Sequence, residues 1–332
     1  MRSSFLALVG LSLMLPITAS AVVLSGTAAS VGQNAFSVTA TPLYPVPFGQ
    51  ERLTFLSDSL DLANASVVVS VGGKVVYQGS VQPVMVPLGK AGVPVVATVA
   101  ITSGGARYTQ TLSLRPQEVA LIAEPLASSP PLYPGKPNTP IEGSVRVVAV
   151  ANLKNLQGRS LDPTALSYSW TIDGTQIANA SGIGKQVVVV ASPLQYRSRD
   201  VSVVVTSQDG SLVGGASLTL SPENPSVRVY ENDPLLGIRY ERALSDPYTI
   251  RGAEATLYVA PFSLSTLGGT PRIQWFLNGS SAQTGPLITL RPSGSGEGNA
   301  SLSVVASAGD YSTATFNLGL IFGSSPGNIF GL

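Results

Sequence analysis

The sequence predicts an all-β chain in which three tandem antiparallel β-sandwich domains follow an N-terminal signal peptide. Two observations carry this prediction. Segments with apolar residues at alternate positions, the period of a half-buried strand, recur at a spacing of about 100 residues. No stretch keeps the apolar period of an amphipathic helix for more than about two turns. Glycine and proline, with 34 and 25 of the 332 residues, supply many turns yet stay below the share typical of disordered chains.

Residues 1–21 show the three parts of a secretory signal peptide. Arg2 precedes an apolar run from Phe5 to Leu15, and the small residues Ala19-Ser20-Ala21 follow shortly after it. We expect cleavage after Ala21 and a flexible leader over residues 22–34. The alternative is an uncleaved N-terminal anchor, although the run is shorter than the roughly 20 apolar residues that span a bilayer. The sequence therefore predicts an exported protein, extracellular, at the cell surface or in the periplasm, with no membrane insertion after cleavage.

One strand and its turn occur in three copies, at residues 67–73, 168–174 and 273–279. In each copy the first, third and fifth residues are apolar, so they are expected to point into a core. The central apolar residues, predicted to be structural core residues, are Val69, Trp170 and Trp275. The copies end in Gly-Gly, Asp-Gly and Asn-Gly, the residues of a type I′ hairpin turn, which needs positive φ at both central positions. The second turn residues are Gly73, Gly174 and Gly279.

Two further strand patterns follow in the same order in every copy. The first covers residues 97–101, 201–205 and 302–306, and the second begins at Leu112, Leu218 and Leu318. We therefore place the domains at residues 35–117, 118–224 and 225–322, with a C-terminal tail at 323–332. A proline-rich segment opens each copy. We interpret these prolines as protection of strand ends and edges against unwanted pairing.

The chain resembles the immunoglobulin-like and PKD-like domain repeats of bacterial exported surface proteins. The residues that carry the resemblance are the strands Trp170–Gly174 and Trp275–Gly279, with the strand and turn pairs at 201–209 and 302–310. The first copy departs from the pattern because Val69 stands where the tryptophan is expected, and no cysteine pair bridges the sheets. The resemblance implies three immunoglobulin-like sandwiches that present their loops to partners. The tail, residues 327–332, also looks like the ending of uncharacterised secreted proteins from small-genome bacteria.

The composition excludes most enzyme chemistry. There is no histidine and no cysteine, so a Ser-His-Asp triad, a Cys-His pair, an imidazole or thiolate metal site and a disulfide are all excluded. The 18 acidic residues lie mostly in turns, which disfavours a pair of catalytic carboxylates. With 19 basic residues against these 18 acids, the chain has no long-range attraction for nucleic acid. We therefore predict that the protein is not an enzyme and needs no cofactor.

A bound Ca²⁺ is the one cofactor that the sequence leaves open. Glu231 and Asp233 lie at the expected junction of the second and third domains, in an acidic segment similar to the linkers of cadherin-like repeats. The second Asp-x-Asp of those linkers is missing. The alternative interpretation of Asp233-Pro234 is ordinary turn chemistry.

The predicted function is that of a structural or adhesive surface protein. Its partner would be a protein or a polymer of the cell envelope, and its sparse charge favours assembly or filament association. The alternative is a carbohydrate- or polymer-binding protein, which would need aromatic side chains aligned on one exposed sheet face. We expect no such stripe, because the tyrosines expected to be exposed are scattered along the sequence. They are Tyr44, Tyr133, Tyr196, Tyr230, Tyr240 and Tyr248.

Overall fold

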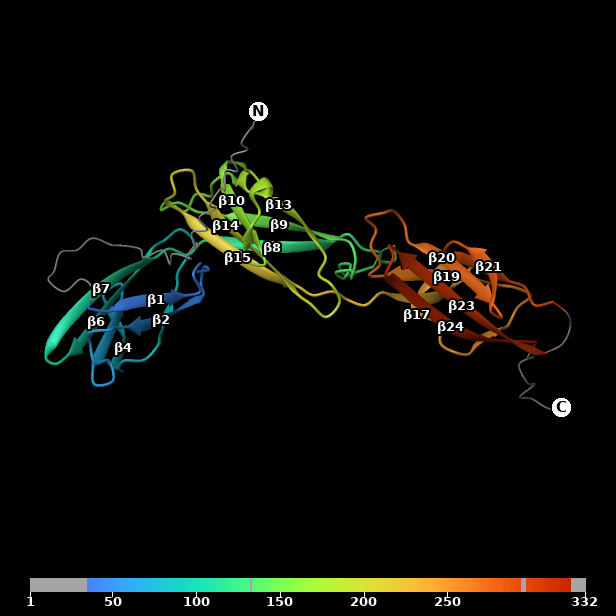
Figure 1. The fold of residues 1–332 in the computed structure, drawn as a ribbon, viewed down its shortest axis with the longest axis horizontal. Coiled ribbons are helices and arrows are strands. Elements are labelled where there is room, and N and C mark those ends of the chain that lie inside the picture. The colour runs from blue at the N-terminus through green and yellow to red at the C-terminus, as the bar shows by residue number, and fades with distance from the viewer. Residues whose placement is uncertain (1–34, 132, 294–296, 324–332) are drawn as a thin grey trace, which may run out of the picture. The chain divides into compact units, whose positions relative to one another are not determined.

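The computed structural model describes residues 35–131, 133–293 and 297–323 (Figure 1). The predicted signal peptide, the whole of the predicted leader and nearly all of the predicted tail lie outside these residues. Strands dominate the described chain, joined by turns and two short 3₁₀ helices, Pro163–Ala165 and Ala178–Ala180. None of the helices in this part of the chain is long and apolar enough to cross a membrane.

The first set of strands pairs into two sheets. The smaller has the order β1-β2-β5 and the larger has the order β4-β3-β6-β7. Alternate residues of β2, β3, β5 and β6 are buried, among them Leu53, Val67 and Val99, so the two sheets enclose an apolar core. The strands are β1 (Ser37–Thr41), β2 (Gln50–Leu56), β3 (Ser66–Val71), β4 (Lys74–Ser80), β5 (Val84–Pro87), β6 (Val95–Ser103) and β7 (Ala106–Leu114).

The second set repeats this topology. A three-stranded sheet has the order β13-β9-β8, and the other sheet has the order β11-β10-β14-β15, with β12 also paired to β10. Residues of both sheets form one hydrophobic core around Trp170. The strands are β8 (Glu118–Pro125), β9 (Ser144–Asn152), β10 (Ser167–Ile172), β11 (Thr175–Gln176), β12 (Gly182–Ile183), β13 (Val187–Ala191), β14 (Arg199–Thr206) and β15 (Val213–Leu220).

The third set adds one strand to each sheet. One sheet has the order β17-β16-β19-β22, and the other has the order β18-β24-β23-β20-β21, in which β18 runs parallel to β24. Their common core surrounds Trp275. The strands are β16 (Ser226–Asp233), β17 (Gly237–Ala243), β18 (Tyr248–Ile250), β19 (Ala255–Phe262), β20 (Arg272–Leu277), β21 (Ser280–Thr284), β22 (Leu287–Leu290), β23 (Gly298–Ala308) and β24 (Ser312–Phe322).

The residues expected at the centre of each core, Val69, Trp170 and Trp275, are fully buried. Each indole is held in an equivalent way. Nε1 of Trp170 donates to the carbonyl oxygen of Lys185 at 2.8 Å, and Nε1 of Trp275 donates to that of Gly285 at 2.9 Å. Both acceptors lie just before the edge strand of the opposite sheet, so each indole links the two sheets and leaves no buried donor unpaired.

The three predicted hairpin turns have the backbone that their residues require. Gly73, Gly174 and Gly279 have φ of 83°, 78° and 78°. The preceding residues, Gly72, Asp173 and Asn278, also have positive φ. This pair of left-handed residues is the signature of a type I′ turn, whose twist matches that of the strands it joins.

The described chain separates into two compact units. Ala40–Arg52, Pro87–Pro94 and the chain from Arg115 onward form the larger unit, and Leu53–Val86 and Val95–Leu114 belong to the smaller one. The three sets of strands therefore do not coincide with the two units. The domain limits at 35–117, 118–224 and 225–322 remain predictions.

Candidate functional site

Aromatic side chains gather on the outer face of the β17-β16-β19-β22 sheet. Val227 and Val229 of β16 belong to the core, so by the alternation of a strand Arg228 and Tyr230 point to the opposite side. Tyr258 of β19 lies directly across from Tyr230 in the antiparallel register. We call the surface formed by Tyr133, Arg228, Tyr230, Tyr240, Tyr258 and Phe262 the tyrosine face.

Three rings form the middle of the tyrosine face. Tyr240, from β17, packs edge-on against Tyr230, with ring centroids 5.4 Å apart, and against Tyr258, with centroids 6.1 Å apart. These edge-to-face contacts are favourable because the positive edge of one ring meets the negative face of the next. Together they bury Tyr230, which is 7% exposed although it lies on the outer side of the sheet. Burial, assisted by the nearby hydroxyl of Tyr258, raises the pKa of Tyr240 to about 12.

Tyr133 and Phe262 form one end of this face. Tyr133 comes from the proline-rich segment between β8 and β9, and its ring meets that of Phe262 edge-on at 5.6 Å. It is 44% exposed, so it is the most accessible ring of the group. Arg228 lies between the two ends of the face and is exposed. Tyrosine and arginine side chains of this kind carry much of the binding energy in protein interfaces.

The sequence prediction that no aromatic stripe exists is wrong. Tyr230, expected to be exposed, is buried, whereas Tyr258, missing from the predicted set, completes the cluster. Tyr196 is exposed but belongs to a loop of the second sandwich. Alternation along β16 and β19 would have placed Tyr230 and Tyr258 outside the core. Only the register of the two strands shows that they are neighbours.

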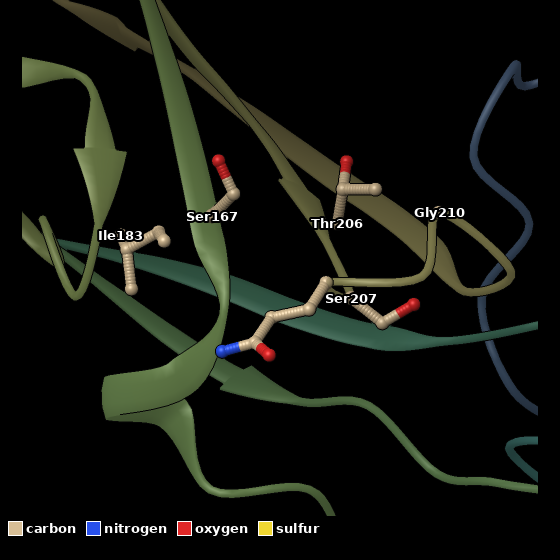
Figure 2. Close-up of a pocket in the computed structure, with 6 residues that line it drawn as sticks. Ser167, Ile183, Thr206, Ser207 and Gly210 are labelled. Carbon is tan, nitrogen blue, oxygen red and sulfur yellow. The ribbon is translucent and has the colours of Figure 1, made fainter.

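A second candidate is a depression in the second sandwich, with a volume of about 710 Å³ (Figure 2). It is lined by Ser167, Ile183, Thr206, Ser207, Gln208 and Gly210. The polar groups at its turn already have partners within the chain. The hydroxyl of Ser207 donates to Asp209 and accepts from the backbone N–H of Leu212 at 3.0 Å. Hydrogen bonds from Ser207 and Ser211 lower the pKa of Asp209 to about 2. The depression is therefore a feature of a well-bonded turn rather than a prepared ligand site.

Of the two residues considered for Ca²⁺, Asp233 is engaged in the turn that follows β16, and a cation at this place stays a prediction. Oδ1 of Asp233 accepts the backbone N–H groups of Leu235 at 2.8 Å and Leu236 at 2.9 Å, as expected for turn chemistry. These hydrogen bonds lower the pKa of Asp233. Glu231 is exposed, and within the described residues no three acidic side chains come together to hold a metal. The turn leaves Leu235 and Leu236 at the tip of the β16–β17 hairpin, 94% and 71% exposed.

The two-sheet topology defines the class of this protein: it is a tandem array of immunoglobulin-like β-sandwiches. No protein-family model matches the sequence. No curated protein matches it either.

Solved structures with similar arrays exist. Three N-terminal domains of the outer capsid protein Hoc of bacteriophage RB49 share 12% identity, with 88% of this chain and 99% of that chain covered and a TM-score of 0.24. The central fibronectin-III array of RIM-binding protein shares 9% identity, with 87% and 96% covered and a TM-score of 0.29. SGBP-B of the mixed-linkage glucan utilization locus of Bacteroides ovatus, in complex with a mixed-linkage heptasaccharide, shares 12% identity, with 89% and 73% covered and a TM-score of 0.21. All three TM-scores lie below 0.5, so no conclusion about this chain is drawn from these similarities.

Proposed function

We propose that this chain is an exported structural or adhesive protein that acts by binding, and that the tyrosine face is its contact surface. The partner is a protein or a polymer of the cell envelope. The observation that carries the proposal is the cluster of Tyr230, Tyr240 and Tyr258, which lies outside the sandwich core and beside an exposed arginine.

Covering these side chains with a partner costs little conformational entropy. Tyr240 and Tyr258 are already held by ring contacts, so they lose little conformational freedom when a partner covers them. Tyr133 and Arg228 add accessible apolar area and a planar hydrogen-bond donor beside them. A preorganised surface of this composition is suited to specific binding.

The experiment measures binding of the labelled chain to a cell-envelope preparation from the organism that produces it. We expect the double variant Tyr133→Ala, Arg228→Ala to weaken binding about tenfold or more, since both side chains are accessible and neither belongs to the core. Tyr196→Ser is the matched control, because Tyr196 is exposed and belongs to the loop between β13 and β14 rather than to the tyrosine face. Equal binding by the double variant, the control and the unmodified chain would overturn the proposal.

Carbohydrate binding is a second candidate, favoured by the presence of several partly exposed tyrosine rings on one sheet face. A sugar ring packs on an aromatic face through its C–H groups, so Tyr258→Phe would keep such binding and Tyr258→Ala would remove it. A glycan array probed with these two variants measures the difference. No array signal from the unmodified chain would eliminate this candidate without affecting binding to a protein.

A further inference from the structure

We propose that β13 pairs with β13 of a second copy of this chain and joins the two molecules into a dimer. The strand lies at the open edge of the β13-β9-β8 sheet. This proposal is independent of the tyrosine face, because none of the residues involved belongs to it.

Backbone hydrogen bonding leaves one side of β13 free. The N–H of Ala149 donates to the carbonyl of Gln186, and the N–H of Ser192 donates to the carbonyl of Gly143. The backbone N–H and C=O groups of the even-numbered residues of β13 therefore point toward β9. Because hydrogen-bonding direction alternates along a strand, Val187, Val189 and Ala191 direct their N–H and C=O groups to the open edge. The carbonyl of Ala191 accepts from Nη1 of Arg199 at 3.2 Å, and its second lone pair can still accept another bond.

The strand itself carries none of the residues that usually prevent pairing, although Arg199 of β14 reaches the carbonyl of Ala191 at its end. In the first sandwich the corresponding edge strand β5 has Pro83 before it and ends at Pro87. In the third, β22 is preceded by Pro286 and followed by Arg291. From Gln186 to Ser192 the second sandwich has neither proline nor charge. Lys185 and Pro193 lie one residue beyond this segment at either end. Proline and charged residues are the usual protection of sheet edges, so β13 is the least protected of the three edge strands.

A second copy fits this edge because the edge is self-complementary. In an antiparallel pair centred on Val189, Val187 would face Ala191 of the other copy and Val189 would face its own equivalent. The backbone N–H and C=O groups of all these residues point to the open edge of the sheet, so each facing pair can exchange hydrogen bonds. No like charges would meet along the strand. Two three-stranded sheets would become one continuous six-stranded sheet, a common size.

Side chains on the outer face support the same arrangement. Val187 and Val189 of β13 are exposed. Val187 lies across from Val148, and Val148 lies across from Ile122, so these three side chains form an apolar strip. Val189 lies across from Arg146, which pairs with Glu124. Pairing of two copies would place Val189 beside its own equivalent, and Ala191 of the other copy beside Val187 at the end of this strip. It would shield part of the strip from water without burying an unpaired charge.

The first test compares Val189→Lys with Val150→Lys by sedimentation velocity over a concentration series. The two valines are 59% and 49% exposed and each variant adds one positive charge, but only Val189 lies on the edge strand. We expect the unmodified chain and Val150→Lys to dimerise and Val189→Lys to weaken the dimer about tenfold or more. A monomeric unmodified chain at about 100 μM, or a dimer that persists in Val189→Lys and dissociates in Val150→Lys, would overturn the proposal.

The second test uses the absence of cysteine from the sequence. Val189→Cys places one thiol at the centre of the proposed pair, where facing Cα atoms would be about 5.5 Å apart. A short bis-maleimide should therefore link two Val189→Cys chains, and the concentration dependence should follow that of the dimer. Val150→Cys is the control and should remain uncrosslinked. Equal crosslinking of the two variants would contradict pairing through β13.

Discussion

At the scale of single residues, the burial of one carboxyl group has a measurable consequence. Glu51 lies on the core-facing side of β2, in phase with the buried residues Leu53 and Phe55. It is fully buried, and neither of its oxygens has a hydrogen-bond partner within the described chain. An ionised carboxylate in this position would lose its hydration without compensation. Burial therefore raises the pKa of Glu51 from about 4.5 to about 7.

The raised pKa predicts a stability that falls as the pH rises. Below about pH 4.5 the carboxyl is protonated in both the folded and the unfolded chain, so there is no penalty. As pH increases toward 7, the unfolded chain releases its proton first, and the free energy of unfolding decreases. Above about pH 7 the loss is complete and is on the order of 3 kcal/mol.

Glu51→Gln, which does not titrate, should remove this dependence. We expect the unfolding free energies of the variant and the unmodified chain to diverge between pH 5 and pH 8, with the variant more stable at the higher pH. Hydrogen exchange of the amides of Gln50–Leu56, corrected for the intrinsic pH dependence of exchange, measures the local stability. Parallel pH profiles for the two proteins would contradict the assignment.

At the scale of elements, the β20–β21 hairpin shows how far local sequence decides backbone geometry. Gly279 has φ of 78°, and a Cβ built on it would meet no atom within 4 Å. Gly268, in a loop of the same sandwich, also has open space around its Cβ position but does not have a positive φ. An added Cβ meets no atom at either glycine, so a difference between the two alanine variants would report the cost of the positive φ alone.

Gly279→Ala should destabilise the third sandwich by roughly 1 kcal/mol, because alanine disfavours the left-handed conformation that the turn requires. Gly268→Ala should be close to neutral or slightly stabilising, since alanine reduces the entropy of the unfolded chain. Chemical unfolding followed by fluorescence in a Trp170→Phe background, where Trp275 is the remaining indole, measures both. Equal destabilisation by the two substitutions would show that the φ of Gly279 is not the cause.

At the scale of the whole molecule, the scarcity of charge is the dominant physical property. Charged residues make up 11% of the sequence, and the formal net charge is +1. The described residues contain four ion pairs, whose side chains are 32% to 73% exposed. Exposed pairs of this kind contribute little to stability. Burial of apolar side chains in the sandwich cores must therefore supply most of the stabilisation.

Thermal unfolding should accordingly be nearly independent of salt. We expect the midpoint to move by no more than about 2 °C between about 50 mM and 500 mM NaCl, since salt screens only charge interactions that contribute little here. Differential scanning calorimetry measures this directly. A fall of about 5 °C or more would mean that ion pairs contribute more than their exposure indicates.

The fold was largely predictable because its signals are local. Alternating apolar residues at 67–71, 168–172 and 273–277 coincide with parts of β3, β10 and β20, and the Gly-Gly, Asp-Gly and Asn-Gly pairs form the turns that follow them. The burial of Trp170 and Trp275 follows from the same alternation. The site was not predictable in this way. Tyr230 and Tyr258 are far apart in the sequence, and β17, which brings Tyr240, joins β16 through an irregular register.

What the sequence alone determined is the set of strands, their inward and outward sides and the turns between them, because each depends on residues within a few positions of one another. The tertiary structure decided which outward-facing residues became neighbours and which edge was left open. Both depend on the pairing order and register of strands separated by long stretches of chain. The tyrosine face and the free side of β13 arise from that pairing, and no local pattern encodes either.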